Sequence, residues 1–99
     1  MRVHFQGDEL TLGRANKNAI GRFIEEFNIE SDRILISGCR NRDDQIGLRR
    51  IYRMRDELIT HGLSNDSIKN AKCADKEYEK ELKPGMVILA HQKPTIPNI

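Results

Sequence analysis

A continuous apolar strand that leads through an arginine-rich turn into an amphipathic helix leaves few choices of fold for this chain. The strand is expected over Asp32–Ser37, and its three consecutive apolar residues predict a central strand rather than an edge strand. The helix is expected to begin near Asp43 or Asp44, either of which can cap it, and to end at Gly62. Its expected core face is Leu48, Ile51, Met54 or Tyr52, and Leu58. Such a strand end beside a helix start is a natural place to hold a small charged ligand.

Shorter elements complete the expected order around this unit. They are strands at 3–5, 67–73 and 86–90, a helix over 12–28 capped by Thr11, and a short charged helix over 74–82. This order predicts an α+β domain, a two-layer α/β sandwich of βαβα(β)αβ order. Right-handed crossovers place two long helices on one face of a mixed four-stranded sheet, with the second and third strands as parallel neighbours. Residues 1–90 are expected to form the domain and residues 91–99 an extended tail.

Length and composition narrow the class of protein. The 99 residues, 37% hydrophobic and 32% charged, fit one polar-surfaced domain. The net charge of +2 is too small to indicate nucleic-acid binding by itself, although residues 40–55 gather six arginines against two aspartates. No apolar run reaches the roughly 18–20 residues that span a bilayer, so this segment is not expected to insert into a membrane. The first residues lack the apolar stretch of a signal peptide, so an exported protein would have to be longer than this segment.

Side chains for catalysis or metal binding do not form a recognisable pattern. The histidines His4, His61 and His91 are far apart in the sequence and flank no nucleophile motif. No Cys-x-x-Cys or histidine spacing indicates zinc, and no glycine-rich phosphate loop is present. We therefore expect a non-enzymatic protein without a metal or cofactor.

The two cysteines, Cys39 and Cys73, each close an expected strand. If those strands are parallel neighbours, both cysteines end at the same edge of the sheet and can form a disulfide. A disulfide would indicate an oxidising compartment. The alternative is two free, buried thiols that behave as small hydrophobic residues.

The order of elements, with particular residues at particular places, resembles the OmpA-like domain, a periplasmic peptidoglycan-binding module of outer-membrane proteins, lipoproteins and flagellar stators. The resemblance covers residues 3–90. Residues 34–38 resemble the strand whose family form ends in Gly-His-Thr-Asp, and residues 46–51 stand where the family has Leu-Ser-x-x-Arg-Ala. Val3-His4-Phe5 with Leu10-Thr11 resembles the first strand and its lead-in, and residues 61–68 resemble the Gly-Ile turn into the third strand.

The resemblance implies a ligand site around Arg50. The family's helix arginine, which holds the diaminopimelate carboxylate of the stem peptide, corresponds to Arg50. The family's aspartate corresponds to Asn41, which has no charge for the ligand's ammonium, and the family's His-Thr is Cys39-Arg40 here. Asp43 lies near the family's loop asparagine and is a candidate for the missing carboxylate. The alternative for this arginine and aspartate group is a solvated helix face with an aspartate cap.

Three functions remain open from the sequence. The first is a periplasmic module that binds peptidoglycan and anchors a longer exported or membrane-anchored protein to the cell wall. The second is a protein–protein assembly module of a secretion or pilus apparatus that has kept the fold and lost the ligand. The third, a cytosolic RNA-binding domain, is disfavoured because the few aromatic residues form no stacking pair on an exposed strand. The expected partners are thus peptidoglycan or another envelope protein, not nucleic acid.

Overall fold

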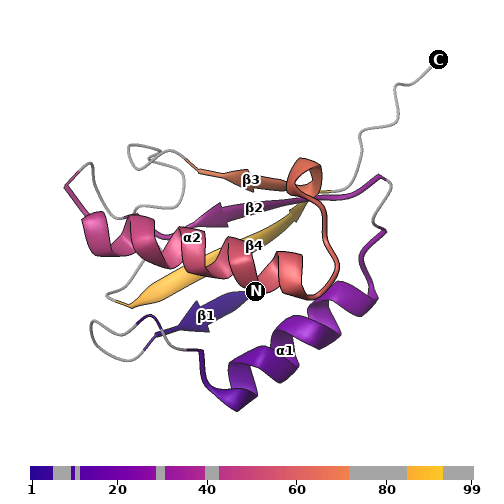
Figure 1. Ribbon diagram of the computed structural model, residues 1–99, viewed down its shortest axis with the longest axis horizontal. Coiled ribbons are helices and arrows are strands. Elements are labelled where there is room, and N and C mark those ends of the chain that lie inside the picture. The colour runs from indigo at the N-terminus through magenta and orange to yellow at the C-terminus, as the bar shows by residue number, and fades with distance from the viewer. Residues whose placement is uncertain (6–9, 11, 29–30, 40–42, 72–84, 93–99) are drawn as a thin grey trace.

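Two helices pack on one face of a four-stranded mixed sheet (Figure 1). The structure is a computed structural model, and it describes residues 1–5, 10, 12–28, 31–39, 43–71 and 85–92. The sheet order is β1-β4-β2-β3, in which β2 pairs parallel with β3, and β4 runs antiparallel to both β1 and β2. The expected two-layer α/β sandwich is confirmed, including the parallel pairing of the second and third strands.

The strands bury one apolar face under the helices. They are β1 (Arg2–His4), β2 (Arg33–Ser37), β3 (Ile68–Asn70) and β4 (Met86–Gln92). Alternate residues point to one face, and on β2 and β4 these are Ile34, Ile36, Val87 and Leu89, all fully buried. The central place of β2 follows from its sequence, because the residue between the two isoleucines, Leu35, is buried on the opposite face.

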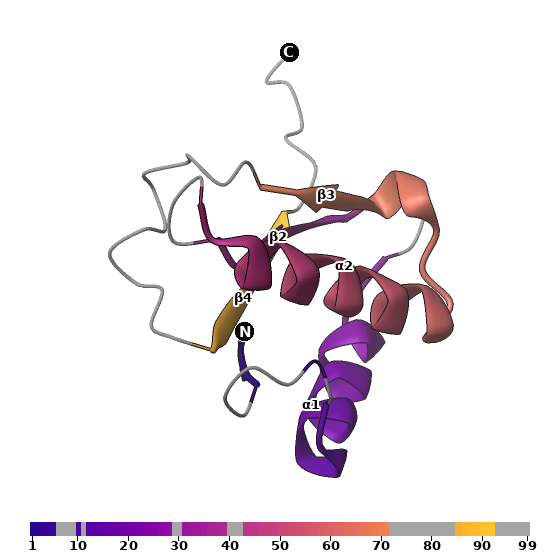
Figure 2. The same cartoon turned by 60° about the vertical axis from the view of Figure 1, so that its left-hand side comes forward.

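The helices α1 (Arg14–Glu25) and α2 (Gln45–Thr60) close this core. Ile20 of α1 is fully buried, as are Ile51, Met54 and Leu58 of α2, and all four join one cluster with the sheet. Gly62 ends the second helix as expected, with a φ of +104° that favours glycine. A 3-10 turn, η1 (Asn65–Ser67), then leads into β3. Figure 2 shows both helices on the same side of the sheet.

Several local expectations were wrong or fall outside the described residues. Leu48 and Tyr52 were expected on the core face of α2, but both are exposed. The first helix begins at Arg14, two residues later than expected. Its N-cap is Gly13, without a side-chain cap, and Thr11 is not among the described residues. His91 and Gln92 extend β4, so the chain does not leave the sheet at residue 90. The short helix expected over 74–82 lies outside the described residues, as do residues 93–99.

Candidate functional site

The strand ends meet at one edge of the sheet, here called the α2 rim. It comprises the residues next to the strand ends, which are Phe5 after β1, Cys39 after β2, Ala71 after β3 and Gly85 before β4. The rim also includes four residues around the start of α2, which are Asp43, Asp44, Gly47 and Arg50. Backbone hydrogen bonds hold this edge together: the Phe5 N–H donates to the Gly85 carbonyl at 2.8 Å, and the Ala71 N–H donates to the Ile36 carbonyl at 2.8 Å. The rim is the place where the sequence predicted a ligand.

Two glycines set the distance between the rim and α2. A Cβ on Gly38 would lie 3.0 Å from Ile51 Cγ1 and 3.2 Å from Val87 Cγ2, so glycine is needed where the strand passes under the helix. A Cβ on Gly47 would overlap the Gly38 carbonyl oxygen. The first turn of α2 therefore lies directly on the end of β2.

Asp44 caps α2, as one of the two sequence alternatives predicted. Its Oδ1 accepts a 2.9 Å hydrogen bond from the Gly47 N–H, which satisfies one of the free donors at the helix start. The Sγ of Cys39 lies 3.7 Å from the Asp44 carbonyl oxygen, which brings the end of β2 against the cap. Asp43, the neighbouring residue, is exposed at the rim.

Arg50 lies one turn beyond Gly47 and faces the sheet. Its guanidinium carbon is 5.9 Å from the centroid of the Phe5 ring, within the range of a cation–π contact. Only 5% of Arg50 is exposed. The helix thus delivers a guanidinium to the edge of the sheet where β1 ends.

The structure brings together part of the predicted site. Arg50 and Asp43 both belong to the α2 rim, whereas Arg40 and Asn41 lie outside the described residues. Cys73 also lies outside them, so its disulfide with Cys39 stays a prediction. The disulfide was expected only if the second and third strands are parallel neighbours. The structure shows this pairing, because β2 and β3 run parallel side by side and end at the same rim.

Other charges on α2 are arranged differently from Arg50. Arg49 is exposed, and Arg53 Nη1 donates to Glu57 Oε2 at 3.1 Å. Glu57 is buried, and its other carboxylate oxygen lies 3.6 Å from His61 Nε2. Arg50 is therefore the arginine of this helix that combines burial with a place at the rim.

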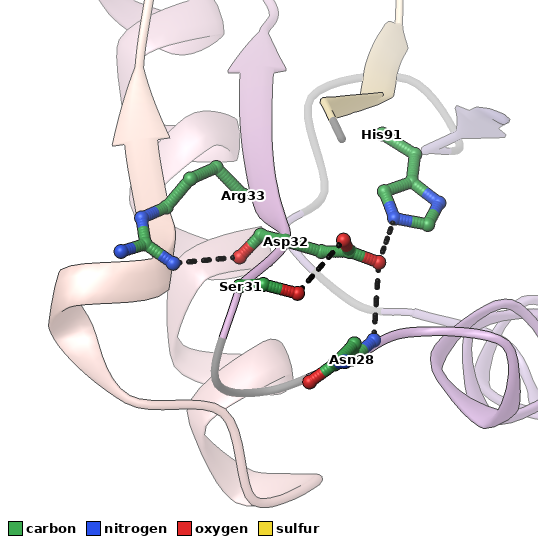
Figure 3. Close-up of polar contacts among 5 residues, drawn as sticks. All are labelled: Asn28, Ser31, Asp32, Arg33 and His91. Atoms are coloured by element: carbon green, nitrogen blue, oxygen red, sulfur yellow. Dashed lines mark hydrogen bonds and ion pairs between the residues drawn. The ribbon is translucent and has the colours of Figure 1, made fainter. Parts of the chain in front are cut away.

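A polar cluster at the opposite end of the sheet was not predicted from the sequence. Asp32 Oδ2 lies 2.6 Å from His91 Nε2 and accepts a 3.1 Å hydrogen bond from the Asn28 N–H (Figure 3). The His91 ring also packs at 5.9 and 5.2 Å, centroid to centroid, from the rings of Phe23 and Phe27. Asp32 is 4% exposed, so this cluster ties α1, β2 and β4 together from inside the protein. Asp32 and His91 are 59 positions apart in the sequence, so no local pattern could have paired them.

The described residues contain no group of three or more His, Cys, Asp and Glu side chains placed to hold a metal ion. Within the same part of the chain, neither helix is long and apolar enough to cross a bilayer.

A comparison with protein-family models finds none that matches this chain, and no curated protein matches it either. The relation of this chain to the OmpA-like domain therefore stays a hypothesis.

Proposed function

We propose that this chain is a non-catalytic, OmpA-like module of the periplasm that binds the diaminopimelate residue of a peptidoglycan stem peptide at the α2 rim. In that role it anchors a longer envelope protein to the cell wall. The position of Arg50 is the single observation that carries the proposal. The residue that the resemblance matches to the family's ligand-binding arginine lies at the rim, against Phe5.

The chemistry of the rim suits an amino-acid ligand with both charges. A guanidinium binds a carboxylate through two parallel hydrogen bonds, and the contact with Phe5 restricts the orientation of the Arg50 side chain. Asp43 supplies an exposed carboxylate for the ligand's ammonium group. In this proposal Asn41 and Arg40, which lie between Cys39 and Asp43 in the sequence, complete the contacts to the peptide.

Sedimentation with purified sacculi tests this function. The wild-type chain is expected to sediment with the cell wall, and Arg50→Ala to stay in solution while keeping its circular dichroism spectrum. Arg49→Ala, which removes the exposed neighbouring charge, is the matched control and should bind like wild type. Equal sedimentation of Arg50→Ala and wild type, or no sedimentation of wild type, would contradict the proposal.

The burial of Arg50 favours a second candidate function. An arginine that is 5% exposed and packed on an aromatic ring also serves to hold α2 on β1. In that case the domain is an assembly module of a secretion or pilus apparatus that has kept the fold and lost the ligand. A stoichiometric complex with another envelope protein, formed by a chain that ignores sacculi, would select this function.

A further inference from the structure

The outer side of α2 carries a stripe of exposed apolar side chains. Leu48, Tyr52 and Ile59 are 36%, 52% and 39% exposed, and they are the large apolar residues that the described part of the chain leaves open to solvent. Leu48 and Tyr52 are one turn apart, and Ile59 follows Tyr52 after about two turns of 3.6 residues. All three therefore lie along one side of the helix. We call these three residues the α2 stripe.

The fold does not account for the α2 stripe. The side of α2 that faces the sheet already carries Ile51, Met54 and Leu58, all fully buried. Single exposed apolar residues are normal on a protein surface, but here all three fall on one side of one helix. Tyrosine is also one of the residue types enriched among those that contribute most of the binding energy at protein–protein interfaces.

The charges beside the α2 stripe are mainly positive. Arg49 is exposed, and Arg55 is half-buried with its Nη2 donating to Asn65 Oδ1 at 3.0 Å. Arg53 is likewise half-buried, and Glu57, which accepts its hydrogen bond, is buried beneath it. Asp56 is the exposed acid of the helix. The outer side of α2 thus combines an apolar line with a surplus of arginines.

We infer that the α2 stripe is a docking surface for an amphipathic segment of a partner protein whose flanks are acidic. Apolar side chains of such a segment would cover Leu48, Tyr52 and Ile59, and its carboxylates would meet Arg49 and Arg55. A second copy of this chain is a poorer occupant, because it would bring arginines against arginines. The α2 stripe differs from the proposed ligand site, since Leu48, Tyr52 and Ile59 face solvent whereas Arg50 is buried against Phe5.

A nuclear magnetic resonance titration of the full chain tests this inference. The probe is a synthetic amphipathic helix with leucines on one face and glutamates on both flanks; the comparison peptide has lysines in place of the glutamates. The glutamate peptide is expected to shift the amide signals of α2, and the lysine peptide to bind about tenfold more weakly or not at all. Equal binding of the two peptides, or shifts centred outside α2, would overturn the inference.

Substitutions assign the contact to individual residues. Tyr52→Ser is expected to weaken binding of the glutamate peptide by about tenfold. Arg49→Glu should weaken it by several fold and make it less sensitive to salt. Arg22→Glu, an exposed arginine of α1, is the matched charge control and should leave binding unchanged. None of these changes should alter sedimentation with sacculi, so failure here is distinguishable from failure of the proposed function.

Two other occupants are outcomes of the same set of variants. A wild-type dimer in analytical ultracentrifugation that becomes a monomer in Tyr52→Ser would assign the stripe to a second copy and overturn the inference. Binding to phosphatidylglycerol vesicles that is abolished by Tyr52→Ser would assign the α2 stripe to a lipid surface and would also overturn the inference. A monomer that ignores vesicles and binds the glutamate peptide through Tyr52 supports it.

Discussion

The carbonyl oxygen of Gly38 lies against the α-carbon side of Gly47, at the place where β2 ends and α2 begins. A Cβ on Gly47 would overlap that oxygen and would also lie 2.6 Å from Asp44 Oδ2. This contact lets the helix rest on the sheet without a side chain between them. It therefore fixes where Arg50, one turn further along α2, meets the rim.

Gly47→Ala is expected to destabilise the domain by about 1–3 kcal/mol, because the added methyl group must push α2 away from β2. Gly21→Ala in α1 is the control, since its Cβ would meet only His61 Cε1 at 3.8 Å. Alanine is a better helix former than glycine, so this control should be stabilised by up to about 1 kcal/mol. Urea unfolding measures the free energy of unfolding of both variants. A Gly47→Ala chain as stable as wild type would show that the contact between Gly38 and Gly47 is not tight.

Asp44→Ala should lower the free energy of unfolding by about 0.5–2 kcal/mol, because the Gly47 N–H loses its acceptor. Asp44→Asn should retain most of the stability, since an amide oxygen also caps a helix. Thermal unfolding of the two variants side by side gives the comparison. An equal loss in both would mean that Asp44 acts through its charge and not as the cap.

The contact between Asp32 and His91 should contribute measurably to stability. Asp32→Ala leaves the Asn28 N–H and the His91 ring without this acceptor, and an expected cost of about 1–3 kcal/mol follows. A double-mutant cycle with His91→Ala should give a coupling of at least about 0.5 kcal/mol. The same cycle with His4→Ala, an exposed histidine of β1, should give none. A coupling near zero for His91 would remove the proposed tie between α1, β2 and β4.

Cys39 and Cys73 are expected to form a disulfide when the chain is prepared from an oxidising compartment. Thiol titration in denaturant should then find no free thiol, and reduction should lower stability by about 3–4 kcal/mol in the chain-entropy model. Cys39→Ser should release one reactive thiol from Cys73. Two free thiols in the unreduced wild-type chain would instead support the alternative of buried, unpaired cysteines.

The order of the helices and strands and the central place of β2 could be predicted from the sequence, but the buried side of α2 could be predicted only in part. Three consecutive apolar residues in β2 indicated its central place, and aspartate before α2 indicated the cap, because both signals are local. The side of α2 was harder to predict. Leu48 and Ile51 are both apolar and nearly a turn apart, but Ile51 packs close to Gly38 and is fully buried, whereas Leu48 is exposed.

The candidate site was predictable only in part for the same reason. Arg50 was assigned to the ligand site through the resemblance to the OmpA-like domain, in which it corresponds to the helix arginine. Its contact with Phe5 depends on the pairing of β1 with β4, and the contact of Asp32 with His91 depends on the pairing of β2 with β4. Such long-range contacts leave no periodic signal in a single sequence.

Binding of a stem peptide to the α2 rim is the central claim, and a pair of matched peptides tests it most directly. One peptide carries diaminopimelate and the other carries lysine at the same position, which removes only the carboxylate that Arg50 is proposed to hold. Isothermal titration should show binding of the diaminopimelate peptide to the wild-type chain, and a loss of about tenfold or more both for the lysine peptide and for Arg50→Lys. Equal affinity for the two peptides, or no binding of either, would contradict the account.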